Sequence, residues 1–288
     1  MGDRTGIEWT DATWNPVTGC TKVSHGCKFC YAERDFHRPY PGRAFTDVQL
    51  HPDRLEIPLR WKRPRRIFVC SMSDLFQEAV DEKYIAKVLA ICELAYWHTF
   101  QILTKRPQRM RSLLSDDGFQ FHVSWFAFQA IRELGLEDRR QELEPYLKKD
   151  SSNIWLGVSC EDQRTADERI PCLLRTPSAL RFVSYEPALE PVSLEKLTGE
   201  FEDGEDKRTF ERWIDRLDWL IAGAESGPKA RPSELAWFRS IRDQCRDAGV
   251  PFFLKQITER GRRVPFEQWP EDLKVREWPE TMKGGIDE

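Results

Sequence analysis

The sequence predicts an α/β fold built on a parallel sheet that forms a TIM-type barrel, either partial or closed. From residue 66 onward, short apolar runs rich in β-branched and aromatic residues alternate with amphipathic stretches. Such runs suit strands that are buried on both faces of a parallel sheet, and strand–helix alternation favours right-handed crossovers. No glycine-rich dinucleotide fingerprint follows any run, which favours a barrel over an open doubly wound sheet.

Seven strands are expected, the first near residues 14–18. Residues 82–96 carry apolar side chains at helical spacing and predict a helix. A second helix is expected over residues 233–247, with Ser233 as its N-cap and Gly249 as its C-terminal stop. The six later strands are expected at residues 67–70, 100–103, 154–158, 180–183, 219–222 and 251–254.

The whole chain, residues 1–288, is expected to form a single domain with one insertion. Residues 117–150 hold an aromatic cluster followed by a charged stretch, and they are interpreted as a helical insertion that could serve as a lid. Residues 199–212 are polar and predict a surface loop. From residue 258 a tail rich in Pro and Trp is expected to wrap around the barrel.

Composition and charge narrow the classes of function. Of the 288 residues, 40% are hydrophobic and 32% are charged, which is typical of a globular protein. No apolar run approaches the roughly 20 residues that span a bilayer, and the first residues lack the apolar core of a secretory signal. A cytoplasmic location without a membrane partner is therefore expected. The net charge of −4 argues against binding nucleic acid mainly through phosphate neutralisation, although residues 60–66 and 105–111 are basic.

Three of the eight cysteines lie within eleven residues. Cys20, Cys27 and Cys30 have the spacing C-x6-C-x2-C, and Gly19 and Gly26 give the backbone the freedom to fold tightly around them. In a cytoplasmic protein such a cluster indicates metal or redox chemistry before disulfides. The other five are isolated in apolar segments and are expected to be ordinary buried cysteines: Cys70, Cys92, Cys160, Cys172 and Cys245.

The spacing alone leaves the metal open. Three thiolates can hold a [4Fe–4S] cluster with one iron that lacks a protein ligand, because such a cluster normally takes four cysteines. Together with His25, the same cysteines would form a closed Cys₃His zinc site. A third reading is that the three cysteines bind nothing.

Polar residues directly follow the predicted strands. In a parallel barrel the carboxyl ends of the strands meet at one mouth, where active sites lie. Charged groups clustered beyond apolar strands are costly to bury without partners, so a functional role is expected for the set. Its members are Ser71, Ser73, Asp74, Thr104, Lys105, Arg106, Ser159, Glu161, Ser184, Glu186, Glu225, Ser226, Lys255 and Gln256.

The cysteine loop resembles the signature of radical S-adenosylmethionine (SAM) enzymes, C-x3-C-x-aromatic-C, which follows the first barrel strand. Phe29 takes the aromatic position, and the first spacing is six residues instead of three. A second resemblance, to the phage Gp37/Gp68 family, covers nearly the whole chain, and that family is itself similar to radical SAM proteins. The matching phrases are WNPVTGC (14–20), SMSDLF (71–76), LTKRP (103–107), WLGVS (155–159), SYEP (184–187), GAESGP (223–228) and FLKQ (253–256).

The resemblance implies a radical SAM enzyme with a [4Fe–4S] cluster on Cys20, Cys27 and Cys30. SAM and an electron donor of the flavodoxin or ferredoxin type would be its partners. It implies SAM-amine contacts from Ser71, Ser73 or Asp74, SAM-carboxylate contacts from Lys105 or Arg106, and further cofactor contacts from Ser159, Gly223 and Ser226. Catalytic roles are expected for Glu161, Glu186, Glu225 and Lys255.

Two alternatives to this enzyme remain. One is a zinc- or cluster-stabilised nucleic-acid-binding protein, suggested by the basic stretches. The other is a barrel hydrolase that uses Glu161, Glu186 and Glu225 as acid–base groups or metal ligands. A nucleic-acid base or nucleotide is a further hypothesis for the substrate of a radical enzyme, with a strand guided by Arg63, Arg65, Arg66 and Arg109.

Overall fold

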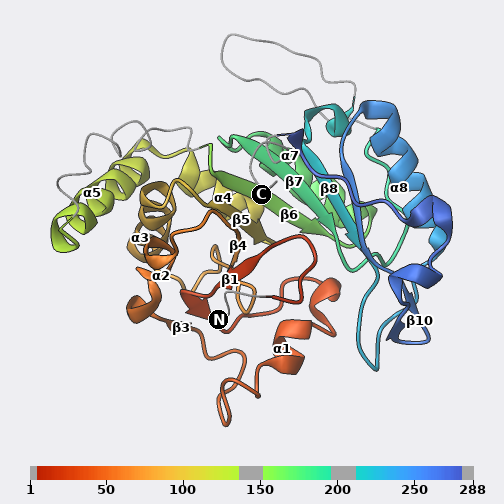
Figure 1. Ribbon diagram of the computed structural model, residues 1–288, viewed down its shortest axis with the longest axis horizontal. Coiled ribbons are helices and arrows are strands. Elements are labelled where there is room, and N and C mark those ends of the chain that lie inside the picture. Colours follow the sequence, from red (N-terminus) through yellow and green to blue (C-terminus); the bar gives the residue numbers. More distant parts are fainter. Residues whose placement is uncertain (1–4, 136–151, 196–211, 281–288) are drawn as a thin grey trace. The chain divides into compact units, whose positions relative to one another are not determined.

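A computed structural model describes residues 5–135, 152–195 and 212–280 (Figure 1). The chain divides into two compact units. The first unit comprises Met1–Lys22, Ala32–Leu156 and Thr176–Leu180. The second unit comprises Val23–Tyr31, Gly157–Arg175 and Arg181–Glu288. Residues 199–211 of the predicted loop and residues 136–150 of the predicted insertion lie outside the described residues.

A seven-stranded sheet runs through the chain in the order β1-β4-β5-β6-β7-β8-β9. The pairs β1–β4 and β4–β5 in the first unit are parallel, as are β7–β8 and β8–β9 in the second. Strands that neighbour one another in chain order and run parallel are those of a partial TIM-type barrel, so the predicted α/β fold class is confirmed. The strands are β1 (Ala12–Trp14), β4 (Arg66–Val69), β5 (Thr99–Thr104), β6 (Ile154–Cys160), β7 (Leu180–Tyr185), β8 (Trp219–Gly223) and β9 (Phe252–Gln256).

The first strand differs from the expectation. β1 ends at Trp14, and residues 17–18, which were expected to continue it, form β2 (Val17–Thr18) and pair antiparallel with β3 (Gln49–Leu50). Pro16 lies between the two strands and has no N–H to offer a ladder. Its carbonyl instead accepts from His51 N at 2.8 Å. The predicted strand is therefore two strands in different sheets.

In the first unit, α3 (Glu82–Leu94) confirms the predicted helix and packs against α5 (Asp117–Glu133). Each helix has an aspartate N-cap that accepts a backbone N–H, Asp81 from Lys83 and Asp116 from Phe119. The described start of the predicted insertion is thus helical. The other α-helices among the described residues before β6 are α1 (Tyr31–Asp35), α2 (Ile57–Arg60) and α4 (Pro107–Leu114).

In the second unit, α7 (Gln163–Leu174) and α8 (Leu235–Ala248) lie between strands. Gly249 ends α8 in the left-handed conformation, with φ of 70°. The predicted N-cap is wrong, because Glu234 occupies that position and Ser233 Oγ donates to Ala188 O at 2.6 Å. Ser233 therefore lies one residue before the N-cap, and its hydroxyl is directed to the Ala188 carbonyl.

The chain beyond residue 258 forms the hairpin β10 (Thr258–Glu259) and β11 (Arg262–Arg263) and then returns to β9. Leu254 N donates to Val275 O at 2.9 Å, and Glu277 N donates to Phe252 O at 2.8 Å. These bonds satisfy an edge of β9 that would otherwise be open. No helix among the described residues is long and apolar enough to cross a membrane.

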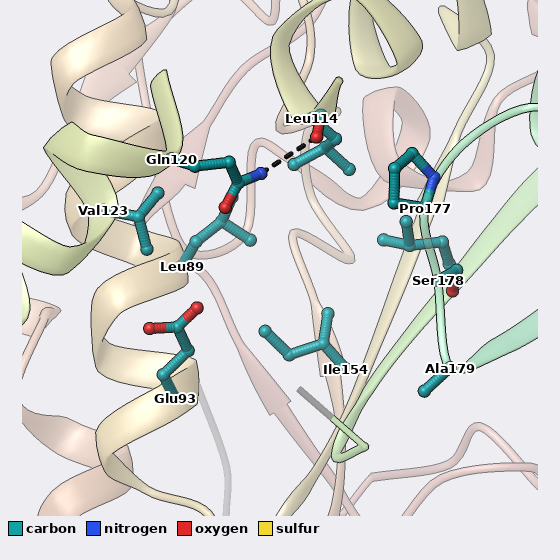
Figure 2. A pocket seen from close by; sticks show the side chains of 10 residues that line it. Leu89, Glu93, Leu114, Gln120, Val123, Ile154, Pro177, Ser178 and Ala179 are labelled. Atoms are coloured by element: carbon teal, nitrogen blue, oxygen red, sulfur yellow. Dashed lines mark hydrogen bonds between the residues drawn. The ribbon is translucent and has the colours of Figure 1, made fainter. Parts of the chain in front are cut away.

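A hollow of about 480 Å³ lies in the first unit between α3, α5 and the beginning of β6 (Figure 2). Its walls are mostly apolar, and Gln120 at its side donates to Leu114 O at 2.9 Å. Because Ile154 begins β6, the hollow lies at the amino ends of the strands. The polar residues discussed below follow the carboxyl ends.

The stability of the fold is expected to be sensitive to acid because His98 is buried. Burial lowers the pKa of His98 to about 4, against the opposing effect of its hydrogen bonds with the backbone at Pro58 and Trp61. Between pH 6.5 and 4 the unfolded chain therefore binds a proton that the folded chain does not, and the free energy of unfolding falls as the pH drops. Stability from the neutral imidazole is complete above pH 6.5.

Between pH 7.5 and pH 5, the free energy of unfolding of His98→Gln should fall by about 2 kcal/mol less than that of the wild type. Urea unfolding at the two pH values measures this difference. His122→Gln is the control, since His122 is exposed on α5. Equal pH dependence of His98→Gln and the wild type would contradict this assignment.

Candidate functional site

The three cysteines of the motif differ in accessibility from the other five. Cys20, Cys27 and Cys30 are partly exposed, whereas all the others except Cys172 are buried. Burial raises the pKa of the thiols of Cys70, Cys92 and Cys245, which keeps them protonated. Because the thiolate is the form that binds a metal, the exposed motif is the better donor set. Cys20 belongs to the first unit and Cys27 and Cys30 to the second, so their surroundings are described separately.

In the first unit, the backbone before Cys20 is held by the segment that follows β4. Ser73 Oγ and Gln77 Nε2 both donate to Gly19 O, at 2.7 and 3.2 Å. Gly19 has φ of +88°, and a Cβ on it would lie 2.5 Å from Asp47 O. Glycine is therefore required here both for its conformation and for space.

Ser71 is engaged one step further back along the same loop. Its hydroxyl exchanges hydrogen bonds with the Asn15 side chain at 3.1 and 3.2 Å, and Asn15 Oδ1 also accepts from Met72 N. The residues after β4 thus hold the residues after β1. The cofactor-binding roles predicted for Ser71 and Ser73 remain predictions, and the contacts give both a positioning role.

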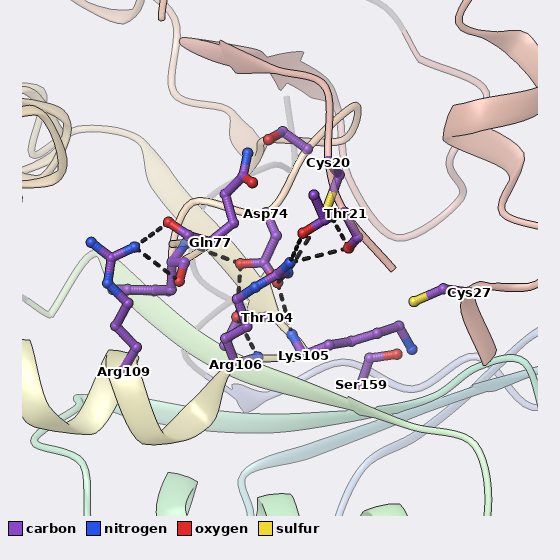
Figure 3. A network of polar contacts seen from close by, with 12 residues as sticks. Cys20, Thr21, Cys27, Asp74, Gln77, Thr104, Lys105, Arg106, Arg109 and Ser159 are labelled. Atoms are coloured by element: carbon purple, nitrogen blue, oxygen red, sulfur yellow. Dashed lines mark hydrogen bonds and ion pairs between the residues drawn. The ribbon is translucent and has the colours of Figure 1, made fainter. Parts of the chain in front are cut away.

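Asp74 is the centre of a polar network at the ends of β4 and β5 (Figure 3). Its Oδ1 accepts from Thr104 Oγ1 at 2.8 Å and from Phe76 N at 3.0 Å. Its Oδ2 accepts from Lys105 N and from Arg106 Nη1, both at 3.0 Å. The carboxylate is only 6% exposed, and four donors compensate its burial.

Arg106 uses every guanidinium donor within the first unit. Nε pairs with Glu78 at 3.0 Å, and Nη2 donates to Thr21 O at 3.1 Å and to Thr21 Oγ1 at 2.8 Å. Nη1 contacts Asp74 and also lies 3.8 Å from Cys20 Sγ. Burial acts to lower the pKa of Arg106, but Asp74, Cys20 and Glu78 outweigh it and raise the pKa. The side chain is therefore a fixed cation beside Cys20.

In the second unit, Glu161 holds the backbone before Cys27. This fully buried carboxylate accepts from Ser24 Oγ at 2.7 Å and pairs with Arg169 Nη1 at 3.2 Å. A Cβ on Gly26 would lie 2.2 Å from Glu161, so only glycine fits against it. Glu161 and Arg169 therefore act on the loop much as Asp74 and Arg106 do in the first unit.

Two further pairs of the second unit hold His25 and Phe29. His25 Nε2 lies 3.1 Å from the carboxylate of Asp162, the N-cap of α7. Arg231 pairs with Glu225, donates to His25 O at 3.0 Å and lies 5.5 Å from the centre of the Phe29 ring. Glu225, which was predicted as catalytic, is thus joined to the loop through Arg231.

Glu186 and Lys255 form a separate pair at the ends of β7 and β9. Lys255 Nζ lies 2.9 Å from Glu186 Oε1, and Ser184 Oγ donates to Glu186 Oε2 at 3.1 Å. A Cβ on Gly223 would lie 2.4 Å from Glu186 Oε1. Ser159 Oγ donates to Glu186 O at 2.9 Å. Five residues singled out in the sequence therefore meet around this ion pair.

These pairings weaken the support for a hydrolase. Glu161, Glu186 and Glu225 are each bound to a cation, namely Arg169, Lys255 and Arg231. Each carboxylate would have to leave its cation before it could activate a water molecule or bind a metal ion.

Sequence reasoning missed several residues of the site. Asn15 and Thr21 lie inside or beside the motif, so their position was a usable signal. Arg169 lies eight residues beyond Glu161 on α7, and Arg231 lies six beyond Glu225; nothing local distinguishes either from a surface arginine. Only the folded chain identifies their partners.

The basic residues suggested to guide nucleic acid are distributed differently from the expectation. Residues 63–66 lead into the amino end of β4, whereas the cysteine-holding residues 71–74 follow its carboxyl end. Arg66 pairs with Asp11. Arg109 donates to Val80 O at 2.7 Å and to Gln77 O, so it fixes a loop. A strand-guiding role for these residues gains no support.

The three thiols of the motif are of the donor type that holds iron–sulfur clusters, but the structure does not bring them together as a metal site. All three thiols are partly exposed, and a buried guanidinium N–H of Arg106 lies 3.8 Å from Cys20 Sγ. In the described parts of the chain, no three Cys, His, Asp or Glu side chains are grouped so that they could hold a metal ion. The His25–Asp162 contact also resembles the orientation of zinc-binding histidines, so metal analysis is the measurement that separates iron from zinc.

Comparison with known proteins gives the family. The model of a family described as "Protein of unknown function (DUF5131)" matches residues 4–280. The chain belongs to this family. No curated protein matches this family member.

Among solved structures, a mutant of spore photoproduct lyase is similar at 11% identity with a TM-score of 0.41. The alignment covers 77% of this DUF5131 chain, which spans 58% of the lyase chain.

The close approach of neighbouring backbone to Gly19 can be tested by comparison with Gly42, a glycine that also has positive φ but open space around it. Gly19→Ala should lower the free energy of unfolding by clearly more than Gly42→Ala. Both positions have positive φ, which costs an alanine about 1 kcal/mol, but only at Gly19 does a Cβ meet backbone oxygens. Chemical denaturation of both variants measures this, and equal losses would show that the close approach is unimportant.

The contribution of the buried Glu161–Arg169 pair to stability can be compared with that of an exposed pair on α7, the helix that carries Arg169. Glu161→Gln should destabilise by roughly 3 to 5 kcal/mol, because Arg169 is left as an uncompensated buried charge. Glu168→Gln, which breaks the exposed pair with Arg164, should cost about 0.5 kcal/mol or less. Similar losses in the two variants, measured by urea unfolding, would argue against a structural role of the Glu161 carboxylate.

Proposed function

We propose that this chain is an iron–sulfur enzyme of the radical SAM type, with Cys20, Cys27 and Cys30 as ligands of a [4Fe–4S] cluster. The observation that carries the proposal is that neighbouring polar side chains hold the motif loop in place and leave its thiols accessible. Polar side chains that follow several strands bind the loop through its backbone or through Ser24, while the three thiols stay partly exposed. A loop of purely structural cysteines would gain more from burying them.

The resemblance to the radical SAM signature favours iron over a closed zinc site, which the spacing alone leaves open. Three thiolates leave one iron of a four-iron cube without a protein ligand. When bound, the cluster and SAM would supply radical chemistry through reductive cleavage of a C–S bond of SAM, with the electron coming from the external donor. Phe29 stands in the aromatic position of the radical SAM signature, where Arg231 lies against its ring.

The chain's own residues would then position the cysteine ligands of the cluster. Asp74 and Arg106 fix Cys20 on one side of the motif, and Glu161 with Arg169 fixes the turn before Cys27. For SAM and substrate, the paired Glu186 and Lys255 beside Gly223 are the preferred candidates, since they offer a carboxylate and an ammonium that can exchange partners.

Several finer points belong to the same proposal. Membership of the phage Gp37/Gp68 family and a reductant of the flavodoxin or ferredoxin type are proposed from the resemblance of the motifs, and a cytoplasmic location is proposed from the composition. A nucleic-acid base or nucleotide remains the suggested substrate class. The likeness of the seven phrases along the chain supports the first of these points most directly.

Anaerobic purification followed by iron, sulfide and zinc analysis tests the cluster. The wild type should be brown, with about four iron and four sulfide per chain, and should cleave SAM to 5′-deoxyadenosine after reduction. Cys27→Ala should lose the colour and the cleavage.

Cys172→Ala is the matched control, because Cys172 is also partly exposed but lies on α7 outside the motif. It should keep both properties. Stoichiometric zinc in colourless wild-type protein would overturn the proposal, as would iron that survives Cys27→Ala.

A further inference from the structure

We propose that the hollow between α3, α5 and the start of β6 is a binding site for a small amphipathic cation (Figure 2). Such a ligand carries an ammonium or amidinium group on an apolar body, and Glu93 receives its positive charge. The residues that line the hollow all belong to the first unit. None of them is part of the cysteine motif, so this inference does not rest on the proposed function.

The size and the wall of the hollow suit a small molecule. Its volume of about 480 Å³, which includes space open to solvent, falls within the roughly 300–1,000 Å³ of ligand sites in proteins. Apolar walls with a few polar groups are typical of such sites, because burial of the apolar body gives affinity and the polar groups set the orientation. The apolar part of this wall comes from Leu89, Leu114, Val123, Ile154, Leu156 and Pro177.

Glu93 is the charged group of this wall. Among the described residues that line the hollow it carries the only charge, and it is 7% exposed. It lies in the last turn of α3, where the negative end of the helix dipole disfavours a carboxylate. A leucine at this position would pack into the apolar wall without the cost of the dipole or of desolvation. A carboxylate here is therefore better explained by the binding of a positive charge than by packing.

The other polar groups of the wall offer acceptors of hydrogen bonds. Ser178 Oγ donates its hydrogen to Leu180 O at 2.7 Å, which leaves the hydroxyl oxygen as an acceptor. Gln120 Nε2 donates to Leu114 O at 2.9 Å, and the carbonyl oxygen of the same amide can only accept. Figure 2 shows Glu93 and Gln120 on one side of the hollow and Ser178 on the other. Acceptors on both sides, together with the negative charge, favour a ligand that brings N–H donors and a positive charge.

The hollow is separate from the polar residues that follow the strands of the same unit. It lies where Ile154 begins β6, whereas Asp74 and Arg106 come after the carboxyl ends of β4 and β5. Active sites of α/β barrels lie at the carboxyl ends of the strands. The hollow is thus an accessory site, at which a ligand binds without taking part in the reaction.

An NMR titration of the ¹⁵N-labelled full chain with three probes of similar shape tests the inference. The probes are phenethylamine, which is a cation at neutral pH, phenethyl alcohol, which is neutral, and phenylacetate, which is an anion. Phenethylamine should bind about tenfold more tightly than the alcohol, because a charge-assisted hydrogen bond to a buried carboxylate is stronger than a neutral one. Phenylacetate should bind more weakly than the alcohol.

Glu93→Gln keeps the shape of the side chain and removes its charge, so amine and alcohol should then bind within about twofold of each other. Glu82→Gln is the control for lost negative charge, because Glu82 is exposed in the first turn of the same helix. It should keep the preference for the amine. Ala179→Trp places a bulky side chain on the wall of the hollow and should weaken the amine about tenfold, which locates the binding.

Binding of none of the probes by the wild type, or equal affinity for all three, would overturn the inference. So would a preference for the amine that survives in Glu93→Gln, or unchanged binding in Ala179→Trp. The probe series on the wild type and Ala179→Trp remain decisive if Glu93→Gln does not fold. A wild type that binds no iron would overturn the proposed function and leave this inference standing.

Discussion

Buried ion pairs between a carboxylate and a guanidinium are the constraint on which the motif depends. Asp74 with Arg106 in the first unit and Glu161 with Arg169 in the second are almost entirely removed from water. Burying two charges costs free energy that their attraction only repays with good geometry and further hydrogen bonds. Both pairs meet that condition through bonds to the loop itself, to Thr21 in one case and Ser24 in the other.

The same arrangement explains why glycine stands before two of the cysteines. Gly19 lies against the carbonyls of Phe45 and Asp47, and Gly26 lies against the Glu161 side chain. Side chains there would push the backbone away from the groups that hold it. Rigid support of this kind is what a metal ligand needs, because a ligand that moves loses affinity and alters the electronic properties of the metal.

Much of the fold could be predicted from the sequence because its strands are buried on both faces and read as apolar runs. Six of the seven predicted strands were located correctly, as was the α3 helix. The first strand was predicted near residues 14–18, but β1 covers Ala12–Trp14. The apolar pattern continues past Pro16, whereas the hydrogen bonds of the strand do not, because proline has no N–H. The N-cap of α8 was wrong because Ser233 has a tertiary partner that no local rule reveals.

By itself, the sequence determined which residues carry donor chemistry: three spaced cysteines and polar groups at the strand ends. Local periodicity and spacing are properties of neighbours along the chain, so they survive without the fold. Only the tertiary structure decided how those groups are used. It gave Arg106 to Cys20 and Thr21, Ser73 to Gly19, and Glu225 to Arg231. Such pairings join residues that are distant in sequence. Whether a charged side chain binds a ligand or a loop therefore depends on which groups the fold places within hydrogen-bonding distance of it.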